Sequence, residues 1–170
     1  VLLSEKPKDV SGSVIISTVE GTRPMLLELQ ALVSPTSFGI AKRTATGVDY
    51  NRVALLLAVL EKRVGLQIQN QDVYINVVGG IKVNEPSMDL GIILSVSSSF
   101  RNLPIDGDVV VTGEVGLTGE IRAVSYIEKR IAECKKLGFK KIVIPKNNYA
   151  SVKDTKGIEI IPVDNLRQAI

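Results

Sequence analysis

The sequence predicts an α+β fold in a single domain, and three observations support this prediction. The chain has 170 residues, which is enough for one domain with a hydrophobic core. Apolar residues make up 45% of it and include many Val and Ile, which favour β-strands. Strand patterns dominate the first third, and helical and strand patterns alternate in the remainder.

The N-terminal third predicts strands and a long loop. Residues 1–12 contain Ser, Lys, Pro and Gly and are expected to form an arm before the domain. Strands are expected at 13–19 and 25–33, although Pro24 also suits the first position of a helix and leaves a helix possible for the second segment. Residues 34–47 are rich in Ser, Thr, Pro and Gly and are expected to be mostly loop.

The middle of the chain predicts two helices around a strand. Asp49 is a suitable N-cap for the first helix, and Gly65 is a suitable residue to end it. Apolar residues repeat between them at helical spacing, at Val53, Leu56, Leu57, Leu60 and Val64. A strand is expected at 72–78, and Pro86 is expected to open a helix that continues to about Phe100.

The last third predicts alternating strands and helices. A strand is expected at 109–112, and the Gly-rich segment 113–122 is expected to fold back on itself. Ser125 and Glu128 have the spacing of a capping box for a helix that stops at Gly138. Two strands at 141–145 and 158–162, and a short helix capped by Asp164, complete the prediction.

The composition excludes several kinds of site. The chain has no histidine and one cysteine, Cys134, so it cannot form a disulfide framework, a Cys/His zinc site or a histidine-based catalytic triad. A lone helical cysteine is expected to be a small core residue in a reducing, cytoplasmic setting. No apolar run reaches membrane-spanning length, and no GxxxxGK[ST] phosphate loop occurs. The missing initiator Met suggests a piece of a longer chain.

Several motifs resemble the proteolytic domain of Lon proteases. They lie within residues 72–170 and read EPSMDLGIIL, DVVVTGEVGLTGEIRAV, IEKRIAECKKLGFKKIVIP and NLRQAI. The segment 32–66 is similar to the Lon-like C-terminal domain of the RadA (Sms) family of bacterial DNA repair proteins. This resemblance implies a Lon proteolytic-domain-like fold, of the ribosomal protein S5 domain 2-like type, over 13–170. It also implies that residues 1–12 lead in from an upstream ATPase domain.

Lon proteases use a catalytic Ser-Lys dyad, and the resemblance implies two matching positions in this chain. The serine is present at the first position, but the lysine is replaced at the second. Ser87 falls in the nucleophile position and Arg130 in the position of the lysine base. A lysine base must lose its proton, whereas arginine keeps its proton in proteins. Met88-Asp89 also replaces the small residues after the nucleophile, and Lys129 points about 100° away from its neighbour on a helix. We therefore expect no catalytic residues, with Ser87 and Arg130 as degenerate positions.

Without catalysis, both dyad positions have ordinary structural interpretations. Ser87 is expected to be a first-turn helix residue that caps the helix or is solvated. Arg130 is expected to be an exposed or interface residue of its helix. The alternative, which the serine leaves open, is an active Ser-Lys endopeptidase of the Lon type.

The resemblance further implies the non-catalytic scaffold and DNA-binding domain of a hexameric, ATP-dependent DNA motor. RadA-type motors act in recombination and repair and promote branch migration with RecA recombinase. Partners would be single-stranded or branched DNA, RecA and five further copies of the chain, with no membrane. No cofactor or metal is expected in this domain, because ATP, Mg and Zn would bind upstream domains. A module that only oligomerises is a further alternative.

Five basic residues are candidates for DNA contact, because Lys and Arg in loops and at element ends can reach phosphates. The net charge of +3 is compatible with nucleic acid but not diagnostic. The candidates are Lys42, Arg43, Arg52, Arg23 and Arg122. The alternative is that they are solvated charges or salt-bridge partners across subunits.

Overall fold

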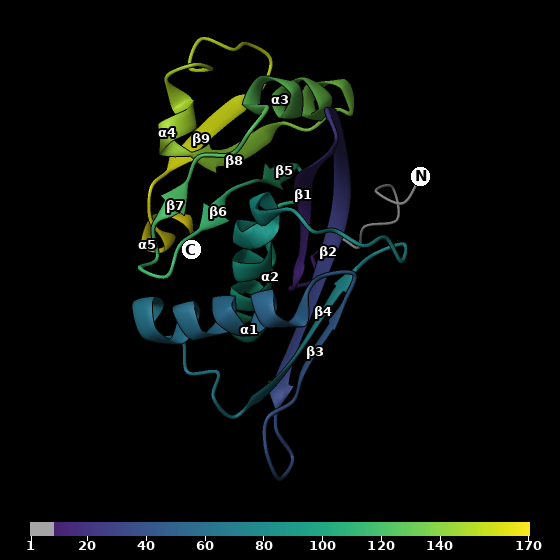
Figure 1. The fold of residues 1–170 in the computed structure, drawn as a ribbon, viewed down its shortest axis with the longest axis vertical. Helices are drawn as coiled ribbons and strands as arrows, with labels where there is room; N and C mark the ends of the chain where they lie inside the picture. The colour runs from purple at the N-terminus through teal and green to yellow at the C-terminus, as the bar shows by residue number, and fades with distance from the viewer. Residues whose placement is uncertain (1–8) are drawn as a thin grey trace.

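A seven-stranded mixed sheet organises residues 9–170, the part of the chain that the computed structural model describes (Figure 1). The strand order is β3-β4-β2-β1-β5-β8-β9. The strands are β1 Ser13–Glu20, β2 Arg23–Pro35, β3 Arg43–Thr46, β4 Gln71–Val77, β5 Val109–Val111, β8 Lys141–Pro145 and β9 Glu159–Val163. Strand β2 pairs antiparallel with β1 and β4, and the other four pairings are parallel.

A small hairpin and several helices complete the architecture. The hairpin, β6 Glu114–Val115 and β7 Ile121–Arg122, confirms that the Gly-rich segment folds back on itself. The helices are α1 Tyr50–Val59, η2 Leu60–Val64, η3 Pro86–Met88, α2 Asp89–Arg101, α3 Ile127–Lys136, α4 Lys146–Tyr149 and α5 Leu166–Ala169. This single-domain mixture of helices and a largely parallel sheet is compatible with the predicted α+β class.

Helices cover both faces of the sheet, and the strand residues alternate accordingly. In β1, Val14 and Ile16 face the larger core beneath α1 and α2, whereas Ile15 faces a second core beneath α3. In β5, Val110 and Val111 divide between the two cores in the same way. Because successive strand side chains point to opposite faces, a strand that is buried on both sides is apolar along its whole length.

The strand predictions for the N-terminal part are confirmed, except at one edge. Residues 25–33 lie within β2, so the helix alternative for this segment is wrong. The segment 34–47, predicted to be mostly loop, contains β3, which pairs with β4 from Arg43 to Thr46. Strand β3 lies at the sheet edge and buries no side chain completely, so it lacks the apolar alternation that would reveal it.

The predicted ends of the first helix are confirmed. The Asp49 side chain accepts a hydrogen bond from the backbone N–H of Arg52 at 3.0 Å, as an N-cap does. The helix continues through a π-helical turn, η2, in which the N–H of Gly65 donates to the carbonyl of Leu60. Gly65 has a φ of 82°, which glycine adopts without strain.

Two predicted helix caps are wrong, and helix α4 was not predicted. Helix α3 begins after Tyr126, which has a φ of 55°, and no side chain caps it, so Ser125 and Glu128 do not form a capping box. Helix α5 is capped by Asn165, not Asp164, because the Asn165 side chain accepts from the N–H of Gln168. At α3 a left-handed turn at Tyr126 starts the helix, and at α5 the cap is the residue after the predicted one.

The predicted burial of the cysteine is confirmed, whereas most of the predicted arm lies outside the described residues. Of the arm predicted at residues 1–12, residues 1–8 lie outside the described part of the chain. Cys134 is buried in the second core, and this burial raises the pKa of its thiol to about 12. No helix among the described residues combines the length and the apolar character that crossing a membrane requires.

Gly91 sets how closely α2 packs on the sheet, and its replacement tests this contact. A Cβ atom at Gly91 would lie 2.3 Å from Cγ2 of the fully buried Ile16. We predict that Gly91→Ala lowers the free energy of unfolding by about 1–3 kcal/mol in chemical denaturation, despite the better helix propensity of alanine.

The matched control is Gly107→Ala, because a Cβ there meets nothing within 4 Å. It should change the free energy of unfolding by less than about 0.5 kcal/mol. Equal effects of the two substitutions would contradict the close-packing interpretation.

Candidate functional site

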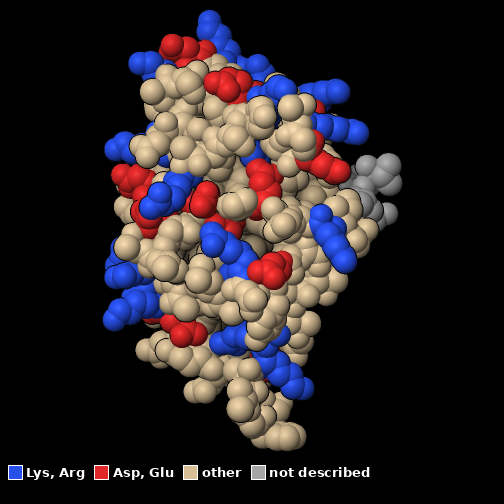
Figure 2. All heavy atoms as spheres, viewed as in Figure 1, with Lys and Arg blue, Asp and Glu red and all other residues tan. Residues whose placement is uncertain are grey.

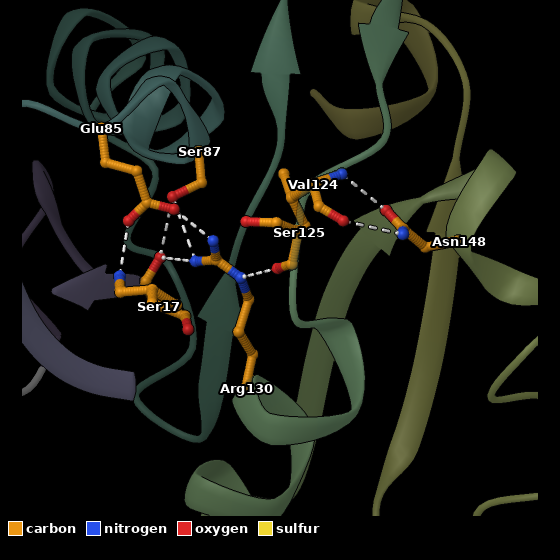
Figure 3. A network of polar contacts seen from close by, with 8 residues as sticks. Ser17, Glu85, Ser87, Val124, Ser125, Arg130 and Asn148 are labelled. Atoms are coloured by element: carbon orange, nitrogen blue, oxygen red, sulfur yellow. Dashed lines mark hydrogen bonds and ion pairs between the residues drawn. The ribbon is translucent and has the colours of Figure 1, made fainter. Parts of the chain in front are cut away.

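Ser87 and Arg130, far apart in the sequence, meet in the interior of the molecule (Figure 3). Ser87 lies in η3 and Arg130 in the first turn of α3. An Nη1 hydrogen of Arg130 donates to Ser87 Oγ at 3.1 Å and to the backbone carbonyl of Ser17 at 2.8 Å. The hydroxyl of Ser87 donates to the same Ser17 carbonyl at 3.2 Å. The three groups form a closed hydrogen-bonded triangle.

Glu85 supplies the negative charge of this network. One carboxylate oxygen forms an ion pair with Nη2 of Arg130, and the other accepts from the backbone N–H of Val19. Glu85 has an extended backbone and directly precedes Pro86, the first residue of η3. Proline fixes the helical φ angle there and lacks an N–H group, so the helix can start at once and hold Ser87 beside Glu85.

Arg130 is the largest fully buried side chain of the described chain. Its remaining donor, Nε, binds the backbone carbonyl of Ser125 at 2.8 Å. The left-handed conformation of Tyr126 turns the chain so that this carbonyl points back at the helix. A buried charge is tolerated where it is paired and its hydrogen bonds are satisfied, and Arg130 meets both conditions.

The structure corrects both sequence-based interpretations of the dyad positions. Arg130 was expected to be exposed or at an interface, but its side chain is 0% exposed. Ser87 was expected to cap the helix or to be solvated, but it is 3% exposed and bonds to β1 instead. Both expectations rest on the local helix alone. The burial arises because α3 packs on β1 and β2, from where the Arg130 side chain reaches Ser17 and Ser87, and no local pattern encodes this packing.

The groups that contact Ser87 Oγ are a carbonyl and a guanidinium. The carbonyl of Ser17 accepts the hydroxyl proton, and the guanidinium of Arg130 donates to the hydroxyl oxygen. A general base must accept the proton fully, and a protonated guanidinium has no lone pair to do so. This arrangement holds the serine in place and supplies no activating base to it.

Two buried hydroxyls beside the network have no hydrogen-bond partner. They belong to Ser17 and Thr112, which follow directly after the paired residues Ile16 and Val111 on β1 and β5. Both residues are 0% exposed. No sequence motif marks Ser17, Thr112 or Glu85 as members of this site, because their contacts depend on elements that are distant in the sequence.

A second ion pair, with a buried carboxylate and a partly exposed arginine, lies close to the first. Arg52 of α1 binds both carboxylate oxygens of Asp89, and its Nη2 also donates to the carbonyl of Val115 at 3.2 Å. Asp89 is 0% exposed and accepts from the N–H of Val115 at 3.0 Å. Hydrogen bonding to Asp89 raises the pKa of Arg52. One of the five DNA-contact candidates therefore has an internal partner.

The other four basic candidates lie on different elements. Lys42 is exposed before β3, and Arg43 binds the backbone carbonyls of Gln71 and Ile68. Arg23 is exposed at the start of β2, and Arg122 of β7 pairs with Glu120 at 2.9 Å. Lys42 and Arg43 are consecutive in the chain, but the five candidates lie on separate elements and do not form one patch. On the face shown in Figure 2, basic and acidic side chains are interspersed.

A metal centre was not expected. Among residues 9–170, no three His, Cys, Asp or Glu side chains are grouped so as to hold a metal ion. The carboxylates nearest the dyad positions, Glu85 and Asp89, are each bound to an arginine.

Comparison with known proteins identifies the family. Residues 38–148, which are 111 of the 170 residues and include Ser87 and Arg130, match the family described as subunit ChlI of Mg-chelatase. The chain therefore belongs to this family.

All 170 residues are also similar to bacterial proteins named DNA repair protein RadA. Identity is 54% with the protein of Bacillus subtilis, 52% with that of Listeria monocytogenes and 49% with that of Streptococcus pneumoniae. The chain spans 37% of the length of the first two relatives and 40% of the third. The sequence resemblance to RadA is thus confirmed for this part of the protein.

The buried network makes Arg130 a strong determinant of stability. Arg130→Met leaves Glu85 without its cation and removes the bonds to Ser17 and Ser125. We predict that it lowers the free energy of unfolding by about 3–5 kcal/mol, measured by urea denaturation.

The control for Arg130→Met is Arg122→Met, which breaks the exposed pair with Glu120. Exposed pairs contribute about 0–1 kcal/mol, so this variant should unfold almost as the parent does. Similar losses for the two variants would show that Arg130 has no special structural role.

Proposed function

We propose that this chain is the non-catalytic, Lon-like scaffold and DNA-binding domain of a RadA-type, hexameric, ATP-dependent DNA motor in recombination and DNA repair. The observation that carries the proposal is the buried guanidinium of Arg130 at the position where a Lon-type peptidase needs its base. The similarity to proteins named DNA repair protein RadA supports the role in repair.

The retained serine and the replaced base favour a scaffold over the alternative of a Ser-Lys endopeptidase. Ser87 is 3% exposed and its hydroxyl is hydrogen-bonded to both Ser17 and Arg130, so a peptide carbonyl has little access to it. Asp89 and Met88 follow it and would place a charge and bulk near a developing oxyanion, which peptidases stabilise with donors. The burial of Ser87 and the residues that follow it therefore favour a structural role for this segment over a catalytic one.

The DNA contact that we propose is electrostatic and is repeated around a ring. Lys42 is exposed beside the hydroxyl-bearing Thr44 and Thr46, and Arg23 adds an exposed guanidinium. The other three candidates already have partners within the chain, which leaves them less available to DNA. Arg52 and Arg122 form ion pairs, and Arg43 binds a backbone carbonyl. A few phosphate contacts on each copy become effective when six copies bind the same strand.

The remaining roles follow from the RadA-type assignment. ATP, Mg and Zn would bind upstream domains, and this domain itself would need no cofactor. The partners would be single-stranded or branched DNA and RecA recombinase, in the cytoplasm.

Lys42 provides the test of DNA binding. We predict that Lys42→Ala weakens binding to single-stranded DNA several-fold and reduces the slope of log affinity against log salt by about 1 per copy, because one phosphate contact is lost. Fluorescence anisotropy over a salt series measures both quantities.

The control is Lys153→Ala, which removes an exposed lysine from the segment between α4 and β9 and should change neither quantity. Unchanged binding by Lys42→Ala would remove this residue from the DNA site. Rings that form without measurable DNA affinity at low salt would favour a module that only oligomerises.

A further inference from the structure

Glu28 is a buried carboxylate that has no cation beside it. It is 3% exposed, and no ion pair joins it to any residue between 9 and 170 within 4.0 Å. Its hydrogen bonds, from the Ser13 hydroxyl at 2.6 Å and the Gln30 amide at 2.9 Å, both reach Oε2. Buried carboxylates are usually paired with a cation, so this side chain is suited to receive one.

Glu28 lines a groove of about 650 Å³ between the start of β2 and the end of α3. The apolar lining includes Met25, Leu26, Val78 and Leu137. The other charged residues in the lining are Glu133, Lys136 and Arg23, of which the two basic ones are exposed. The groove thus combines an apolar surface with a buried negative charge.

The loop between β2 and β3 carries the complementary groups. Phe38 and Ile40 are each 92% exposed, and Lys42 is exposed two residues further on. The base of the loop is held by Asp72, which accepts from the N–H of Lys42 at 2.8 Å and from the Thr36 hydroxyl at 3.0 Å. The same bonds lower the pKa of Asp72. A fixed stem therefore presents two apolar side chains and one cation to the surroundings.

The groove and the loop lie at opposite ends of the molecule. Strand β2 has 13 residues, begins at the groove and ends at the loop, so it separates them by roughly 40 Å. Figure 1 shows the loop at the lower end and α3 at the upper end. The loop of one molecule therefore cannot fill its own groove, whereas it can reach the groove of a neighbour.

We propose that the loop of residues 37–42 docks in the β2–α3 groove of a second copy of the chain, with Phe38 and Ile40 on the apolar lining and Lys42 at Glu28. The contact is head-to-tail, so repetition closes a ring or extends a filament. The inference rests on the self-assembly proposed above and names the contact that produces it. A Lys42 side chain held at Glu28 of a neighbour is not free to contact a phosphate, so this contact and the Lys42 contact to DNA proposed above exclude each other within one copy, and the variants below distinguish them.

Two exposed substitutions test the contact from its two sides. The tip variant is Phe38→Ser with Ile40→Ser, and the groove variant is Leu137→Lys, at a position that is 48% exposed. In analytical ultracentrifugation of this chain, we expect each variant alone to associate at least tenfold more weakly than the parent. The control Leu117→Ser removes a leucine that is 62% exposed from the β6–β7 hairpin and should assemble as the parent does.

Mixing the two variants gives a specific result. A tip variant retains its groove and a groove variant retains its loop, so one intact contact forms per pair. We expect the equimolar mixture to give dimers and no larger species. Glu28→Gln and Lys42→Met should each weaken association, and the double variant should weaken it by less than the product of the two separate effects.

The other outcomes separate this inference from the proposed function. A tip variant that assembles normally, while the groove variant does not, would place another segment in the groove and overturn the inference. A tip variant that assembles normally but loses DNA affinity would make the tip a DNA-binding element and overturn it as well. In both cases the scaffold proposal survives. A parent chain that stays monomeric at every concentration would contradict the scaffold itself.

Discussion

The guanidinium of Arg130 joins four segments that are distant in the sequence. It binds the end of β1 through Ser17, the approach to η3 through Glu85, η3 through Ser87 and the start of α3 through Ser125. Each of its three nitrogens has a partner, and these contacts hold α3 and the second core below it against the rest of the fold. A charge buried without these partners would destabilise the fold, so the four segments are required together.

Under the proposed Lon-like assignment, these contacts would account for a dyad position that is kept without dyad chemistry. Ser87 and the guanidinium of Arg130 are in contact, each of the three guanidinium nitrogens has a partner, and Glu85 supplies the opposite charge. A lysine in a peptidase must give up its proton during the reaction, whereas the stabilising role of Arg130 requires its charge to remain. The neighbouring pair of Arg52 and Asp89 is built in the same way and connects α1, α2 and the β6–β7 hairpin.

The sequence predicted the elements well where periodicity is strong, as in β1, β4 and α1. The prediction of secondary structure was wrong where a short motif or a weak apolar pattern was the only signal. Strand β3 has no buried alternation, and the Ser125 motif is displaced by the left-handed turn at Tyr126. The pairing of Ser87 with Arg130 was suggested by resemblance to a family, while their burial and the part played by Glu85 were not. Those features arise from tertiary packing, which residue spacing does not encode.

We propose that Ser87 is held by a structural cation and does not act as a nucleophile. The most direct measurement is hydrolysis of an unfolded protein substrate, such as casein, by the parent chain and by Ser87→Ala at equal concentrations. We expect neither protein to show hydrolysis above the buffer background. Hydrolysis by the parent that Ser87→Ala abolishes would overturn this proposal, because it would require a base for Ser87 that these contacts do not supply.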